Sequence, residues 1–82
     1  MVEVEYENAF KKAFEKIKDE LLKIKIKKQL AKIIENPNVG KPMQYSRKGS
    51  REVYVSPFRL SYSYYPTKDK IFISELYHKD KQ

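Results

Sequence analysis

The arginines of this 82-residue chain are the first residues whose type and spacing suggest chemistry. Fifteen residues are lysine but only three are arginine. The arginines all lie in one short stretch, at Arg47, Arg51 and Arg59. Arginine offers a planar fork of N–H donors that binds phosphate at two points and stacks on bases. Lys41 and Lys48 share this stretch, where Glu52 is the one acidic residue. This local excess of positive charge predicts contact with nucleic-acid phosphates.

Pairing within a sheet is the alternative for Arg59. Glu52 and Glu75 each lie on a strand predicted beside it. Either carboxylate could form an ion pair with the guanidinium across strands, which stabilises a sheet. In that case Arg59 would serve the fold rather than a ligand.

His78 is the only histidine, and it directly follows the last predicted strand. A side chain at that place is exposed yet held by a rigid scaffold, and histidine exchanges protons near neutral pH. Lys79 beside it adds a cation. These residues predict an acid–base group at the mouth of the sheet. A polar C-terminus without a function is the alternative.

Six of the seven tyrosines lie in the second half of the chain. Tyr62 and Tyr64 alternate with serines, so we expect one face of their strand to pack in the core. Other tyrosines of this half accompany the basic residues and could stack on bases. These are Tyr45, Tyr54, Tyr65 and Tyr77.

These side chains need a scaffold, and the first half of the chain begins with a strand and a helix. The N-terminal residues alternate between apolar and acidic, which predicts a half-buried strand from Val2 to Tyr6. The period then changes to helical spacing, and we expect a helix over residues 9–17 with Asn8 as its cap.

A second, longer helix is predicted over residues 20–35. Pro37 and Gly40 indicate where it ends, since proline disfavours helix in the residue before it and glycine suits a helix exit. Its predicted buried stripe consists of Leu22, Ile26, Leu30, Ile33 and Ile34.

Strand-forming residues dominate after Pro42 and are separated by turns. The predicted strands cover residues 43–47, 51–55, 59–65 and 70–77. The order β-α-α-β-β-β-β predicts an α+β fold of one domain over residues 1–82. A helical hairpin would cover one face of a curved antiparallel sheet. The N-terminal strand would join this sheet at an edge or in its middle.

Composition limits the class of protein. Eighteen Lys and Arg against eleven Asp and Glu give a net charge of +7, which attracts phosphate backbones and acidic proteins. The lack of cysteine excludes thiolate metal sites and fits a reducing compartment. No apolar run approaches the roughly 20 residues of a membrane span, and no paired histidine or cysteine spacing predicts a metal site. We therefore expect a cytoplasmic protein with no cofactor, no metal and no membrane contact.

Short motifs in the second half resemble the RelE/ParE toxin superfamily. They are, in order, Gly40-Lys41-Pro42, Arg51-Glu52-Val53-Tyr54-Val55, Phe58-Arg59-Leu60-Ser61-Tyr62, Ile71-Phe72-Ile73 and Tyr77-His78-Lys79. The expected order of a strand, a helical hairpin and a meander is also similar, so the resemblance covers the whole chain. The RelE/YoeB branch, which consists of messenger RNA interferases of type II toxin–antitoxin systems, is the most similar branch.

This resemblance implies an endoribonuclease toxin that enters the ribosomal A site and inhibits translation. It would promote attack of a ribose 2′-hydroxyl on the adjacent phosphate. Arg59 would stabilise the phosphate and His78 would move a proton, with Arg51 and Lys79 completing the catalytic set. The implied partners are the ribosome, messenger RNA and an antitoxin encoded in the same operon. The implied RNA-binding set comprises Lys41, Arg47, Lys48, Tyr54 and Tyr77.

Departures from the family pattern support an alternative function. Met43 stands where the YoeB branch has a glutamate, and Lys79 stands where it has a final tyrosine. Glu52 and Tyr54 stand where RelE has lysines. A homologue that binds without cleaving, such as a ParE-like inhibitor of DNA gyrase, is the alternative. A nucleic-acid-binding domain unrelated to toxins is a third interpretation.

Overall fold

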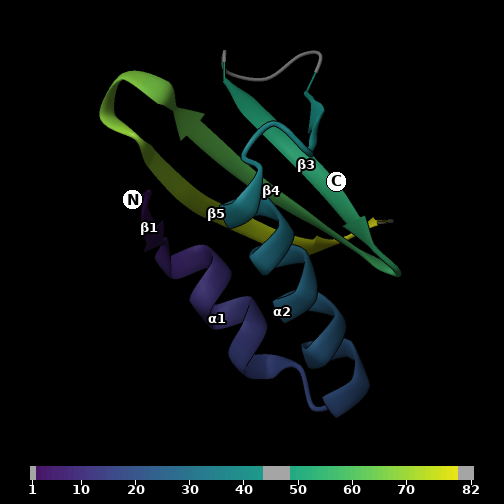
Figure 1. Ribbon diagram of the computed structural model, residues 1–82. Coiled ribbons are helices and arrows are strands. Elements are labelled where there is room, and N and C mark those ends of the chain that lie inside the picture. The colour runs from purple at the N-terminus through teal and green to yellow at the C-terminus, as the bar shows by residue number, and fades with distance from the viewer. Residues whose placement is uncertain (1, 44–48, 80–82) are drawn as a thin grey trace.

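The computed structural model describes residues 2–43 and 49–79. The elements in these residues follow the predicted β-α-α-β-β-β-β order, which confirms the α+β fold (Figure 1). The helices are Asn8–Lys16 (α1) and Glu20–Glu35 (α2). The strands are Glu3–Tyr6 (β1), Lys41–Pro42 (β2), Ser50–Val55 (β3), Phe58–Tyr65 (β4) and Lys70–His78 (β5). A single 3-10 turn, Pro66–Lys68, precedes β5.

Across the described residues the strands form one five-stranded sheet in the order β1-β5-β4-β3-β2. β2 to β5 make the predicted antiparallel meander. β1 lies parallel to β5 at the opposite edge from β2, with Val4 opposite Ile71. The sequence left an edge or a central position open for this strand, and the structure places it at the edge.

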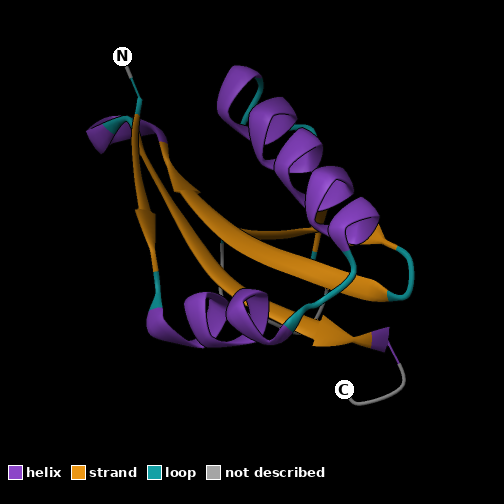
Figure 2. Ribbon diagram, turned by 90° about the horizontal axis from the view of Figure 1, so that it is seen from below, coloured by secondary structure: helices purple, strands orange, loops and turns teal. Residues whose placement is uncertain are grey.

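Both helices pack on the same face of the curved sheet (Figure 2). We call this side the helix face and the opposite side the open face. The core lies beneath the helices, where Phe10 of α1 and Ile26 and Ile33 of α2 are buried against the sheet. The sheet contributes alternate residues to this core, as strands with one buried face do. They include Leu60, Tyr62, Ile71, Ile73 and Leu76.

The ends of the helices differ from the sequence prediction. Asn8 is the first residue of α1 rather than its cap, and Glu7 in the cap position makes no side-chain cap bond. For α2 the cap is Asp19, whose carboxylate accepts from the N–H groups of Leu21 at 3.0 Å and Leu22 at 3.3 Å. Ile34, predicted to be buried, is 38% exposed near the C-terminal end of α2.

The strand that the structure shows before β3 is Lys41–Pro42 (β2), which lies directly before the strand predicted over residues 43–47. The N–H of Met43 donates to the carbonyl of Ser50 at 3.1 Å, which extends the pairing with β3 by one bond. Residues 44–48 lie outside the described part of the chain.

Candidate nucleic-acid interface

The open face carries a set of polar side chains from three neighbouring strands. Arg59 of β4 lies opposite Tyr54 of β3 and opposite Tyr77 of β5. Their neighbours in sequence, Leu60 and Leu76, are buried in the core. Because side chains alternate between the two faces of a strand, Arg59, Tyr54 and Tyr77 point away from the helices.

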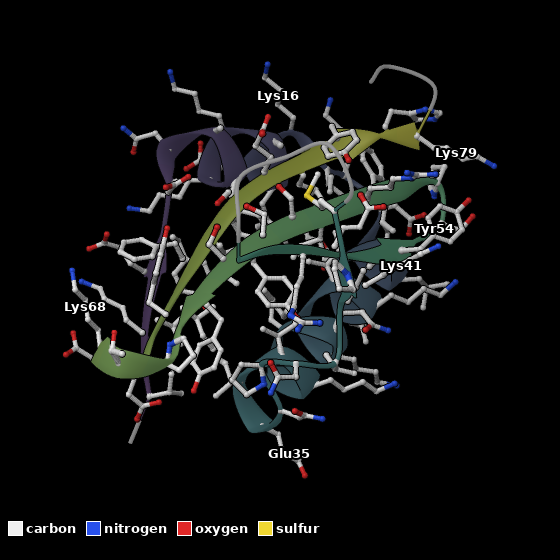
Figure 3. The ribbon with its side chains drawn as sticks, turned by 90° about the horizontal axis from the view of Figure 1, so that it is seen from above. Lys16, Glu35, Lys41, Tyr54, Lys68 and Lys79 are labelled. Atoms are coloured by element: carbon white, nitrogen blue, oxygen red, sulfur yellow. The ribbon has the colours of Figure 1, made fainter. Side chains whose placement is uncertain are left out.

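A groove of about 260 Å³ lies on this face, at the end of the sheet where β5 stops. Its lining residues are Lys41, Glu52, Val53, Tyr54, Arg59 and Lys79. Lys41 reaches it from β2, opposite Glu52. Lys79 follows β5, and its ammonium lies 5.8 Å from the centre of the Tyr54 ring. Figure 3 shows Lys41, Tyr54 and Lys79 gathered at one side of the molecule. We call this the open-face groove.

Glu52 contacts Arg59 and Tyr77 through its carboxylate. One carboxylate oxygen pairs with Nη1 of Arg59 at 3.3 Å. The other oxygen accepts a hydrogen bond from the Tyr77 hydroxyl at 3.1 Å. The pairing of Arg59 with Glu52, which the sequence suggested as an alternative, is therefore present. It occurs inside the groove, so it organises the cationic site and does not remove Arg59 from it.

Tyr77 keeps its proton in this setting. Burial raises the pKa of its hydroxyl above the ordinary tyrosine value, and the hydrogen bond and charge of Glu52 raise it further. Arg59 opposes this rise in the pKa, but only in part. At neutral pH Tyr77 is thus a hydrogen-bond donor to Glu52 and not a base.

Arg51 lies on the other face of β3. Its Nη1 donates to the carbonyl of Gly40 at 2.7 Å and to that of Asn38 at 3.2 Å. The guanidinium therefore fixes the loop that leaves α2 for β2. Tyr62 contacts the same loop, because its hydroxyl accepts from the Gly40 N–H at 2.8 Å and donates to the Pro37 carbonyl at 2.7 Å.

His78 also lies away from the open-face groove. It is opposite Phe58 in the register of β4 and β5, with the two rings edge to face and 5.6 Å between their centres. Alternation from buried Leu76 puts it on the helix face. Phe58 lines a second hollow there, between the helices and the sheet, together with Ile17 and Leu22. The structure therefore places His78 and Arg59 on opposite faces of the sheet.

The family of the chain follows from its sequence. Residues 4–82 match the model of the "ParE toxin of type II toxin-antitoxin system, parDE". The chain belongs to this ParE toxin family. Among curated proteins, the chain has no significant match.

Solved structures show that this ParE-family chain has the RelE-like fold. The isolated RelE toxin of E. coli superposes with a TM-score of 0.82 at 15% identity, over 100% of this chain and 88% of that one. A chain of the E. coli DinJ–YafQ complex gives 0.76 at 21% identity, over 98% and 96%. A chain of the archaeal RelE–RelB complex of Pyrococcus horikoshii gives 0.77 at 11%, over 99% and 98%. At these identities the likeness concerns the fold.

Of the nine site residues predicted for this ParE-family toxin, the structure brings five together. Arg59, Lys79, Lys41 and Tyr54 line the groove, and Tyr77 reaches it through Glu52. Arg51 and His78 lie on the helix face. Arg47 and Lys48 lie outside the described residues.

Glu52 is the member of the site that the sequence prediction missed. Its signal was present, because it is the one acid among the basic residues from 41 to 59. The sequence does not reveal its place in the site, because its contact with Tyr77 spans 25 residues of sequence and depends on the register.

Among residues 2–43 and 49–79, no group of three or more His, Cys, Asp or Glu side chains could hold a metal ion. No helix within these ranges is long and apolar enough to cross a membrane.

Proposed function

We propose that this type II toxin is a ribosome-dependent messenger RNA endonuclease that inhibits translation in the cytoplasm. The observation that carries the proposal is the open-face groove, where the cations Lys41, Arg59 and Lys79 converge beside an exposed tyrosine. Convergent cations bind consecutive phosphates of a nucleic acid, and an exposed aromatic ring stacks on a base. Tyr54, which is 53% exposed, provides that ring.

Each groove residue has a chemical role in this proposal. Arg59 binds the scissile phosphate and stabilises the charge that develops on its oxygens. It can do so while Glu52 occupies one nitrogen, because a guanidinium has five N–H donors. Lys79 and Lys41 bind flanking phosphates, and the Lys79 ammonium can give a proton to the leaving oxygen.

This proposal gives Arg51 and His78 roles other than the catalytic ones that the resemblance implies. Arg51 positions Lys41 by fixing the loop before β2 through two carbonyl groups. His78 supports the end of β5, next to Lys79, through its ring contact with Phe58. In this proposal both residues shape the groove from the far side of the sheet and do not touch the RNA.

An inhibitor of DNA gyrase, or another toxin that binds without cutting, is the second candidate function. Two observations favour it. The family that the chain matches is that of the ParE toxin. The only histidine of the chain lies on the face opposite the open-face groove.

We also propose an antitoxin, encoded in the same operon, as the partner that neutralises this chain. The similar folds include toxin–antitoxin complexes, RelE–RelB and RelBE among them. The net charge of +7 and the cations of the groove would attract an acidic segment.

Primer extension on a messenger RNA translated in vitro tests the proposed cleavage. The proposal predicts new 5′ ends when both the ribosomes and the protein are present, and none with the Arg59→Ala variant. A DNA supercoiling assay with purified gyrase is run in parallel. An intact message together with inhibited gyrase would overturn the nuclease proposal and establish the second candidate.

A further inference from the structure

The attacking 2′-hydroxyl must lose a proton, and few groups at the open-face groove can take it. Lys41, Arg59 and Lys79 are the cations that bind phosphates in the proposed function. Tyr77 is protonated because its pKa is raised. His78 lies on the other face of the sheet. Of the described residues that line the groove, Glu52 alone carries a carboxylate.

We infer that Glu52 is the general base that takes the proton of the attacking 2′-hydroxyl. This inference rests on the proposed nuclease function and assigns the one catalytic role that the proposal leaves open. It gives Glu52 a role in catalysis beyond its ion pair with Arg59.

The contacts of Glu52 leave room for a substrate. Its two oxygens each have one observed partner, Arg59 at 3.3 Å and Tyr77 at 3.1 Å. A carboxylate oxygen has two lone pairs, so each oxygen can accept one more hydrogen bond. The 2′-hydroxyl and the phosphate it attacks are neighbours in RNA. A phosphate bound to the free N–H groups of Arg59 therefore brings this hydroxyl to the carboxylate that Arg59 already touches.

The surroundings hold the carboxylate in place. Glu52 lies in β3, which pairs with β2 on one side and β4 on the other, and its side chain is 22% exposed. The charged and titratable groups around it come from every adjacent element. They are Lys41 from β2, Tyr54 from β3, Arg59 from β4, Tyr77 from β5 and Lys79 after β5. A base fixed in this way needs no reorganisation before proton transfer.

Groups in the groove accept and supply the protons that the reaction transfers. The 2′-oxygen forms a bond to phosphorus as its proton moves to a Glu52 oxygen. The bond between phosphorus and the 5′-oxygen breaks, and that oxygen takes a proton from the Lys79 ammonium. The products are a 2′,3′-cyclic phosphate and a 5′-hydroxyl end. Glu52 then releases its proton to water and Lys79 regains one.

Single-turnover cleavage of messenger RNA on programmed ribosomes, measured across pH, tests this role with the Glu52→Gln variant. We expect a loss of about 10²–10⁴ in rate, as for removal of a general base. We also expect the acidic limb of the pH–rate profile to disappear, while cosedimentation with ribosomes is retained. Glu75→Gln is the matched control, since Glu75 is an exposed acid of β5 that does not line the groove. This control should cleave like the unmodified protein.

The outcomes separate the inference from the proposed function. Cleavage by Glu52→Gln at the normal rate would overturn the role of Glu52 and leave the nuclease standing. A slow variant that keeps the acidic limb would also overturn it, because Glu52 would then only position Arg59. An unmodified protein that does not cut would overturn the function and the inference together.

Discussion

Three residues on three adjacent strands prepare the site before any ligand arrives. Glu52 of β3 holds Arg59 of β4 and receives the hydroxyl of Tyr77 of β5. A partly exposed ion pair contributes little to stability, but here it fixes the direction of the guanidinium. Catalysis by charge stabilisation depends on such preorganised groups. The ion pair is therefore more important for the proposed activity than for the fold.

At the residue scale, replacing His78 separates a positioning role from a catalytic one. We predict that His78→Ala lowers the rate of messenger RNA cleavage by less than about tenfold, whereas loss of a direct acid–base group costs about 10²–10⁴. The reason is its place on the helix face against Phe58. His78→Phe, which keeps an aromatic ring, should restore the rate. A hundredfold loss in both variants would show that the imidazole takes part in the chemistry.

A second prediction at this scale concerns Tyr62 and the dependence of folding stability on pH. Its pKa is raised, mainly by burial, while Gly40 and Arg51 oppose the rise. A raised pKa means that the folded state holds the proton more tightly than the unfolded state. The stabilisation is complete below pH ~10, the ordinary tyrosine value, and is lost as the pH rises above it.

Urea unfolding of the unmodified protein and of the Tyr62→Phe variant, at pH 7 and under alkaline conditions, measures this loss of stability. At pH 7 the variant should lose about 1–3 kcal/mol, because the buried N–H of Gly40 and the partly buried carbonyl of Pro37 lose their partner. Above the ordinary tyrosine pKa the unmodified protein should lose stability faster than the variant. An equal decline in both proteins would contradict the assignment to Tyr62.

At the element scale, the groove depends on how α2 begins and ends. Its N-terminus is capped by Asp19, and its C-terminal loop is fixed to the sheet by Arg51 and Tyr62. That loop leads into β2, which carries Lys41 to the groove. The helix face thus determines the position of a cation on the open face.

Removing the cap tests the first of these contacts. Asp19→Ala should lower the free energy of unfolding by about 1 kcal/mol, the usual value for an N-cap. Asp19→Asn keeps an oxygen that can accept from the N–H groups of Leu21 and Leu22, and it should retain most of the stability. Equal losses in the two variants, measured by thermal unfolding, would indicate that the charge of Asp19 matters rather than its hydrogen bonds.

Sequence patterns predicted the elements well, because apolar residues recur with a period of 2 in strands and of 3.6 in helices. Boundaries were harder to predict. Asn8 was predicted to cap α1 but is its first residue, whereas the cap that forms side-chain bonds is Asp19 of α2, which was not predicted. Which face each site residue occupies depended on strand register. The register of β4 and β5 shifts between Ser61 and Tyr62, and counting along the sequence does not reveal this shift. The separation of His78 from Arg59 could therefore not be predicted.

At the scale of the whole molecule, the net charge of +7 attracts phosphate backbones. Under the proposed function, the groove turns that attraction into local contacts with RNA. The logarithm of the binding constant for single-stranded RNA falls as the logarithm of the salt concentration rises. The slope is about 0.7 for each phosphate contacted. Three groove cations thus predict that the groove contributes about 2 to this slope.

Fluorescence anisotropy of a labelled single-stranded RNA across salt concentrations measures the slope. Lys79→Ala should reduce it by about 0.7. Lys28→Ala, which removes an exposed cation from α2, should leave it unchanged. The same slope in all three proteins would show that RNA is bound somewhere other than the open-face groove.

The most direct test of the central claim, that the open-face groove is the toxic surface, is growth arrest after induced expression of Arg59→Ala. The guanidinium lies on the open face, and its absence leaves the core untouched. We predict that cells expressing this variant keep growing, although the protein accumulates as much as the unmodified chain. The Lys28→Ala control should still arrest growth. Arrest by Arg59→Ala at equal abundance would contradict the assignment of function to the open-face groove.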